Sequence, residues 1–186
     1  FLSVGEEPVS VNFKPGLHII TGVNKDKQDR RNGVGKSTIA DAINFAIFGS
    51  TIRELKKENI PNNLTGKTTH TELTFTINNN SYKIVRTLNP SRCNLYINDI
   101  DSTRDSITNT TDHICKLLNT SQEIFQNCVI MTLNNTVPFM AQKKIEKRKF
   151  IEGIFGLEVF SQMLSQARSN YNDVKKDYDS LLTRHE

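Results

Sequence analysis

The chain has 186 residues, of which 24 are basic and 20 acidic, for a formal net charge of +4. This length suits one hydrophobic core, or one lobe of a larger core, and is short for two complete domains. We expect a soluble, cytoplasmic protein without a membrane span or signal peptide, because the sequence contains neither 18 consecutive apolar residues nor a charged-then-apolar leader. The mildly basic balance permits a polyanionic partner without requiring one.

Cysteine and histidine usage gives no sign of a metal site. Cys93, Cys115 and Cys128 are odd in number and widely spaced, and the four histidines are equally scattered. No C-x-x-C pair or Cys/His cluster occurs, so we interpret the three cysteines as reduced structural thiols rather than zinc ligands or nucleophiles.

The first predicted elements are two strands and a helix. Residues 9–13 ("VSVNF") alternate apolar and polar side chains, and residues 16–22 ("GLHIITG") follow a Pro-Gly turn, so both segments predict strands. Residues 35–48 are apolar nearly all round, with Asp41 and Asn44 as the strongly polar interior residues. Such a helix has to be buried against a sheet, and Gly49 is placed to end it.

A glycine-rich region joins the second strand to this helix. Counting back from Lys36 in "NGVGKST" finds Arg30 where the phosphate-binding motif G-x-x-x-x-G-K-[S/T] requires glycine. Gly22 stands eight residues before that position, and excising eight residues restores the full motif. The side chains of the inserted piece, residues 25–31, are charged or carry amides, so we expect it to bulge into solvent. The alternative is that it contacts a bound nucleotide or a second copy of the chain. For the motif as a whole, the alternative is a chance G-x-G-K-S.

The chemistry of such a loop predicts ATP and Mg²⁺ as cofactors. Backbone N–H groups and a helix N-terminus surround the phosphates, while Lys36 reaches the β- and γ-phosphates as the catalytic cation. The next hydroxyl, on Ser37, is the predicted magnesium ligand. The predicted nucleotide-binding residues are Gly22, Asn32, Gly33, Gly35, Lys36, Ser37 and Thr38.

Beyond the helix, the pattern changes twice. Residues 71–77 and 81–88 alternate cleanly around "NNN", which predicts a hairpin, and residues 93–98 extend it as a third strand. A helical period follows, with one apolar face made of Ile107, Ile114, Leu117 and Leu118. Residues 125–131 ("FQNCVIM") then predict a buried strand.

From Leu157 onward the apolar residues are spaced alternately three and four apart, through Phe160 and Leu164 to Leu181. This spacing predicts the seam of a coiled coil, with an amphipathic surface helix as the alternative. We therefore divide the chain into a lobe at residues 1–156 and the start of a coil at residues 157–186.

A basic run precedes the coil. Residues 143–149 ("KKIEKRK") carry six charges, five of them positive: Lys143, Lys144, Lys147, Arg148 and Lys149. These five residues are candidates for contact with DNA phosphates. The alternative is an ordinary solvated helix face.

Several segments together resemble a known family. In order, they are "NGVGKSTIADAINFAIFG", "YKIVR", "IFQNCVIM", "TVPFM", "KKIEKRKFIEGIFGLEVF" and the heptad helix. They are similar to the N-terminal ATPase lobe of the SbcC/Rad-fifty family, SMC-like ABC-type ATPases that include the large subunits of phage recombination endonucleases. The resemblance implies an α/β head lobe, with a P-loop and a mixed sheet that includes an antiparallel hairpin, leading into a coiled coil.

The resemblance also implies the function. It implies an ATP-binding subunit of a complex that processes DNA double-strand breaks, in which two copies dimerise around ATP and gate access of double-stranded DNA to a metallophosphoesterase nuclease. The Walker B acids and signature sequence would lie in a C-terminal lobe, so this segment alone should not hydrolyse ATP. The chain departs from the family in two places. One is the charged insertion, and the other is the position of the Q-loop glutamine, which contributes to magnesium binding in the family. Asn134 or Asn135 stands near that position and would be the replacement ligand.

Two other classes stay open. An SMC-like scaffold would bind ATP and bridge DNA without a nuclease partner. A P-loop kinase or GTPase would need a complete catalytic set in one continuous domain, and the heptad pattern from Leu157 argues against that.

Overall fold

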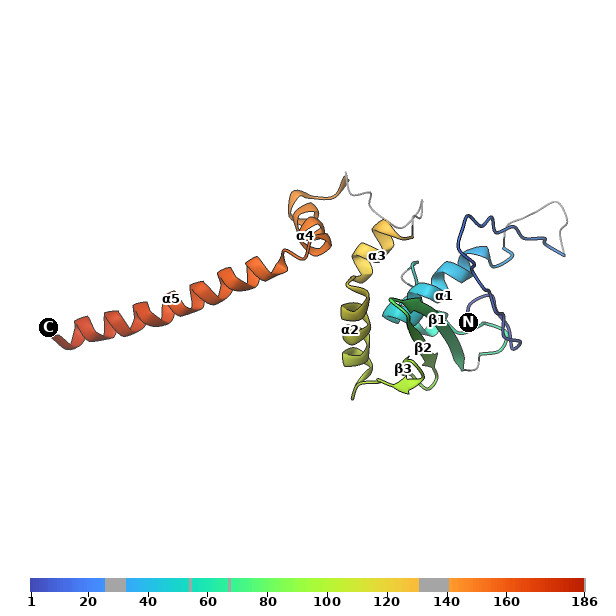
Figure 1. Cartoon of the computed structure of the whole chain (residues 1–186), viewed down its shortest axis with the longest axis horizontal. Coiled ribbons are helices and arrows are strands. Elements are labelled where there is room, and N and C mark those ends of the chain that lie inside the picture. Colours follow the sequence, from blue (N-terminus) through green and yellow to red (C-terminus); the bar gives the residue numbers. More distant parts are fainter. Residues whose placement is uncertain (26–32, 54, 67, 131–140, 186) are drawn as a thin grey trace.

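The structure is a computed structural model, and it describes residues 1–25, 33–53, 55–66, 68–130 and 141–185 (Figure 1). In chain order its elements are α1 (Lys36–Phe48), the 3-10 turn η1 (Lys57–Asn59), β1 (Thr69–Ile77), β2 (Asn80–Leu88), β3 (Arg92–Ile97), β4 (Ile100–Asp101), α2 (Ile107–Leu118), α3 (Gln122–Cys128), α4 (Lys144–Ile154) and α5 (Glu158–His185). None of the helices in these residues is both long enough and apolar enough to cross a bilayer.

In the described residues the sheet has four strands in the order β1-β2-β3-β4, and every pair is antiparallel. Asn78 and Asn79 join β1 to β2 with φ of 49° and 65°. Two successive residues with positive φ suit the right-handed twist of a tight hairpin, and asparagine tolerates this conformation. The predicted hairpin and third strand are therefore confirmed. The short strand β4, which was not predicted, follows a second turn of the same kind at Asn98 and Asp99.

The main core lies where α1 and α2 pack against the sheet (Figure 1). Its buried residues are Ile47, Ile84, Cys93, Leu95 and Ile114. A second cluster joins the start of the chain to α1 and β2 through Phe1, Phe45, Ile60 and Leu88. The predicted burial of the helix after the glycine-rich region is confirmed, and Gly49 ends that helix with φ of 78°.

Helix α2 also forms where its period predicts it. Ser106 caps its first turn by accepting a hydrogen bond from the Asn109 N–H. Of the four residues predicted to share its apolar face, Ile114 is fully buried, whereas Ile107 and Leu117 are 40% and 38% exposed. The face that packs is therefore narrower than the sequence suggests.

The two strands predicted before the glycine-rich region are not formed. Residues 9–13 and 16–22 have no regular secondary structure, and Val9, Leu17 and Ile19 expose most of their side chains. A strand exists only when a second strand satisfies its backbone groups, and no described residue pairs with these segments. The described sheet is consequently antiparallel throughout, and the mixed sheet of the prediction is wrong for this part of the chain.

The buried strand predicted at residues 125–131 is also wrong. Residues 122–128 form α3, capped by Ser121, whose hydroxyl accepts a hydrogen bond of 3.3 Å from the Ile124 N–H. A short apolar run does not by itself distinguish a strand from a helix. The serine cap and Glu123 in the first turn were the signals for a helix.

Helix α5 extends away from the sheet as a single arm (Figure 1). Its 28 residues span about 42 Å at 1.5 Å per residue. Phe160, Leu164, Tyr171 and Val174 are all more than half exposed along it. A helix was predicted here and is confirmed, whereas its pairing in a coiled coil and the domain boundary at residue 157 stay predictions.

Candidate nucleotide-binding site

The glycine-rich turn opens directly into α1. Gly33 and Gly35 have φ of 80° and 82°, a left-handed conformation that a residue with a Cβ atom rarely adopts. The turn ends at Lys36, the first residue of α1, and the N-cap residue Gly35 has no side chain with which to cap that helix. The N–H groups at a helix N-terminus are suited to bind an anion.

Gly22 lies against this turn although it precedes Gly33 by eleven residues in the sequence. A Cβ atom at Gly22 would overlap the Val34 side chain and would stand 3.8 Å from Lys36 Cγ. The position therefore has no room for a side chain. The sequence pattern singles out the same glycine as the displaced first residue of the motif. Asn32 and most of the insertion lie outside the described residues.

A pocket of about 500 Å³ adjoins the turn. Residues 33–38 line it together with the apolar residues Leu2, Leu55 and Pro61. Ser3 also lines it, and its hydroxyl lies 2.7 Å from the Thr38 hydroxyl. All the described residues of the predicted phosphate loop except Gly22 thus meet at one pocket, together with a segment that the sequence did not single out.

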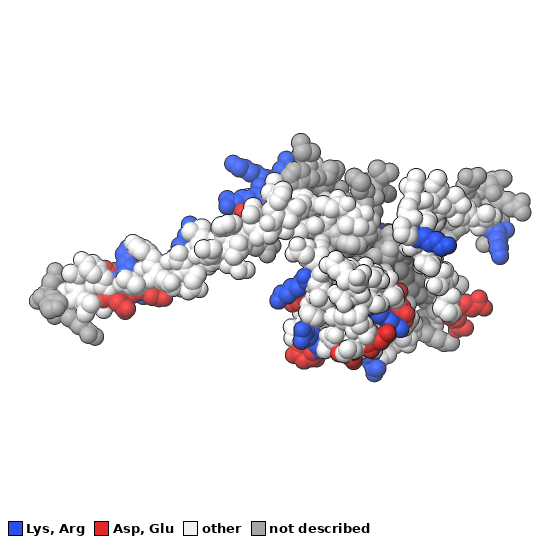
Figure 2. Space-filling view, in the orientation of Figure 1, with Lys and Arg blue, Asp and Glu red and all other residues white. Residues whose placement is uncertain are grey.

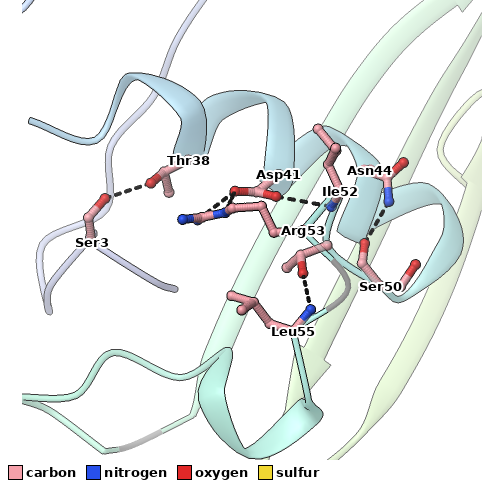
Figure 3. A network of polar contacts seen from close by, with 9 residues as sticks. Ser3, Thr38, Asp41, Asn44, Ser50, Ile52, Arg53 and Leu55 are labelled. Atoms are coloured by element: carbon pink, nitrogen blue, oxygen red, sulfur yellow. Dashed lines mark hydrogen bonds and ion pairs between the residues drawn. The ribbon is translucent and has the colours of Figure 1, made fainter. Parts of the chain in front are cut away.

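Two polar residues of α1, Asp41 and Asn44, hold the loop that follows the helix, at residues 50–53 (Figure 3). Asp41 is 2% exposed, and its Oδ1 accepts a hydrogen bond of 3.0 Å from the Ile52 N–H. Its Oδ2 accepts hydrogen bonds from Arg53 Nε at 3.0 Å and Nη2 at 2.7 Å. One turn further along, Asn44 donates to the Ser50 carbonyl at 2.8 Å. Because a buried carboxylate is tolerated only when paired and hydrogen-bonded, these contacts explain why an otherwise apolar helix contains Asp41.

Arg86 holds the other end of α1. Its guanidinium is buried and donates to the carbonyls of Ala46 and Ile47 and to the Thr111 hydroxyl, each at 3.0 Å. Desolvation by burial lowers the pKa of Arg86. The positive charge sits at the negative end of the helix dipole, so one residue of β2 links α1 to α2. No sequence pattern indicated this role, because Arg86 occupies an ordinary position in an alternating strand.

The predicted DNA-binding residues lie at the beginning of α4. Figure 2 shows Lys and Arg side chains gathered over this helix, and of the five predicted residues only Lys147 is partly buried. Arg148 forms an ion pair of 2.7 Å with Glu152, one turn along the helix. The start of α4 is thus a basic, solvent-facing surface. Such a surface agrees both with contact to DNA phosphates and with an ordinary solvated helix face.

The described residues hold no group of three or more His, Cys, Asp and Glu side chains placed to bind a metal ion. Asn134 and Asn135, the predicted replacements for the Q-loop glutamine, lie outside those residues. Burial raises the pKa values of Cys93 and Cys115, which keeps both thiols protonated and unreactive near neutral pH.

Comparison with known proteins agrees with this geometry. The model of the AAA domain family matches residues 1–185. The chain is 28% identical over 167 residues to exonuclease subunit 2 of Escherichia phage RB69, an alignment that covers 87% of this chain and 28% of that protein. It is 26% identical over 178 residues to the DNA double-strand break repair Rad50 ATPase of Methanocaldococcus jannaschii, covering 94% of this chain and 16% of that protein.

A third relative is the SbcC component of the nuclease SbcCD from Lactococcus lactis, which is 26% identical over 172 residues, covering 79% of this chain and 16% of that protein. The chain thus spans less than a third of the length of these relatives. The family match and the shared names lead to one conclusion: the chain belongs to the AAA domain family and, within it, to the SbcC/Rad50 group of ATPases.

Proposed function

We propose that this chain binds ATP with Mg²⁺ in the pocket beside residues 33–38, as one half of an ATPase head. The observation that carries the proposal is that the left-handed turn at Gly33 and Gly35 and the start of α1 line one pocket, with Gly22 packed against that turn. Fixed N–H dipoles in such a turn and at a helix N-terminus are suited to bind phosphate groups.

Each residue of the loop has a distinct task in this proposal. The Lys36 ammonium neutralises the β- and γ-phosphates, and the first-turn N–H groups orient them. The Ser37 hydroxyl lines the same pocket one residue further on, which suits it to hold Mg²⁺. The metal ion, when bound, screens the phosphate charge; Thr38 contributes a hydroxyl already fixed by Ser3.

Hydrolysis needs further carboxylates, and the described residues near the pocket do not supply them. Asp41 is engaged by Ile52 and Arg53 in the interior. Acids after residue 140, such as Glu146 and Glu152, belong to helices rather than strand ends. We therefore assign the Walker B acids to a C-terminal lobe. The exposed apolar side chains of residues 9–23 and of α5 are surfaces that such a lobe and its returning coil would cover.

The wider role in our proposal is that of a DNA repair or recombination ATPase. Two copies would close around ATP and control access of double-stranded DNA to a metallophosphoesterase nuclease subunit, in the host cytoplasm if a phage encodes the protein. Support comes from the relatives, whose names are an exonuclease subunit, a double-strand break repair ATPase and a nuclease subunit. An SMC-like scaffold without a nuclease is the alternative, and co-purification of a metallophosphoesterase would exclude it.

The direct test is Lys36→Ala. Backbone dipoles do not replace a point charge at the β- and γ-phosphates, so we expect this variant to fold and to lose ATP binding. Isothermal titration calorimetry in Mg²⁺ measures the affinity, and circular dichroism checks the fold. Lys56→Ala, which removes an exposed lysine that does not line the pocket, is the control. Tight ATP binding by folded Lys36→Ala would contradict the proposal.

A further inference from the structure

Arg53 is a cation fixed at the wall of the same pocket. Two of its nitrogens donate to one oxygen of Asp41, Nε at 3.0 Å and Nη2 at 2.7 Å. These bonds set the plane of the guanidinium, which has five N–H donors in a rigid fork. Within the described part of the chain, the remaining nitrogen Nη1 makes no hydrogen bond or ion pair.

The two side chains of the Asp41–Arg53 ion pair differ in their exposure to solvent. The Asp41 side chain is 2% exposed, whereas that of Arg53 is 48% exposed. Figure 3 shows the guanidinium lying alongside α1 and extending from Asp41 toward the end of the helix that carries Thr38. A buried carboxylate thus directs a solvated cation along the wall of the pocket toward the phosphate loop.

Tethering the loop after α1 does not require this cation. The Ile52 N–H already bonds Asp41, and the Ser50 carbonyl already accepts from Asn44. Arg53 also neutralises the buried Asp41 carboxylate, but that role uses Nε and Nη2 alone. The pairing therefore holds the half-exposed guanidinium in place and leaves Nη1 available to a ligand in the pocket.

We propose that Arg53 binds the α-phosphate of the nucleotide and that Asp41 is its positioning residue. This inference rests on the nucleotide binding proposed above. Lys36 takes the β- and γ-phosphates. Thr38 lies two residues further along α1, and Asp41 lies on the same helix face three residues beyond Thr38, about 4.5 Å along the axis. The Arg53 guanidinium lies on the Thr38 side of Asp41 (Figure 3), beyond the two residues assigned to the β- and γ-phosphates and Mg²⁺, and its planar fork matches phosphate oxygens.

A contact to the α-phosphate has a measurable signature. ADP and the non-hydrolysable ATP analogue AMP-PNP share the α- and β-phosphates, so Arg53→Gln should weaken both by a similar factor, about ten- to a hundredfold for a lost charged hydrogen bond. AMP has the α-phosphate alone, so its binding should weaken by the same factor if the contact is to the α-phosphate and stay unchanged if it is to the β-phosphate. Arg53→Lys keeps the charge but not the fork, so its affinities should fall between those of Arg53→Gln and the unchanged chain. Lys56→Gln, the matched control, should bind both nucleotides as the unchanged chain does.

The role of Asp41 is tested by a double-mutant cycle on ADP affinity. Asp41→Asn should weaken ADP binding when Arg53 is present and have no further effect on Arg53→Gln, because it acts through that side chain. Thermal unfolding of every variant separates loss of affinity from loss of fold. If Arg53→Gln does not fold, Arg53→Lys takes its place in the same comparison.

The outcomes are distinct. Folded Arg53→Gln with unchanged ADP affinity would overturn the inference, and so would a loss confined to AMP-PNP, which would place the contact at the γ-phosphate. If Lys36→Ala abolishes binding while Arg53→Gln does not change it, nucleotide binding stands and only the role of Arg53 fails. If the unchanged chain binds neither nucleotide, the proposed function fails together with this inference.

Discussion

At the scale of single residues, three polar side chains explain how α1 is held, and they were predictable to different degrees. Asp41 and Asn44 stood out in the sequence as polar residues three apart in an apolar helix, which marks one face. Their partners, Ile52 and the Ser50 carbonyl, depend on the path of the following loop. Arg86 contacts α1 only after two segments 40 residues apart have packed, so no local pattern indicated it.

Arg86 supplies a prediction at this scale. Arg86→Met keeps most of the side-chain volume but removes the donors to Ala46, Ile47 and Thr111. We expect the free energy of unfolding to fall by about 2 to 4 kcal/mol, because buried carbonyls lose charged hydrogen bonds. Urea denaturation measures the change, with Arg92→Met on the exposed side of β3 as the control. Equal stability of the two variants would show that Arg86 does not join α1 to α2.

At the scale of elements, local signals sufficed wherever an element is completed by its own neighbours. The Asn78-Asn79 turn closes a hairpin whose strands satisfy each other, and α1 ends at Gly49 as predicted. Residues 9–13 and 16–22 have the right alternation but no pairing strand in the described residues, so their pattern did not produce strands. Alternation specifies which face is buried only if something covers that face.

The basic start of α4 supplies a prediction at the same scale. Replacing Lys143, Lys144, Lys147, Arg148 and Lys149 by glutamine should weaken binding of duplex DNA by the assembled complex. Each lost phosphate contact should lower the slope of log affinity against log salt by about one, because fewer counterions are released. Fluorescence anisotropy over a salt series measures the slope.

The control for this prediction is the replacement of three cations elsewhere on the surface, Lys83, Arg92 and Arg104, by glutamine. It changes the net charge in the same direction without touching α4. A slope that stays unchanged in the α4 variant, or that falls equally in the control, would identify the run as an ordinary solvated helix face.

At the scale of the whole molecule, the described residues combine the pocket that we propose for a nucleotide with many exposed apolar side chains. The side chains of Phe160, Leu164 and Val174 are exposed along α5, and those of Leu17 and Ile19 are exposed in the segment before the glycine-rich turn. Exposed apolar side chains that gather on one element often mark an interaction surface. The family could be predicted from motif order, whereas the exposure of these side chains could not be seen in the local sequence.

The central claim is that this chain binds ATP but is half of a catalytic head, and ATP turnover tests it most directly. Steady-state hydrolysis in Mg²⁺ is measured for the purified chain alone and after addition of the C-terminal lobe, then with the nuclease subunit and linear duplex DNA. The account predicts binding without turnover by the chain alone, and turnover once the lobe supplies its acids. Magnesium-dependent turnover by the chain alone, abolished in Lys36→Ala, would contradict the account and indicate a self-contained P-loop enzyme.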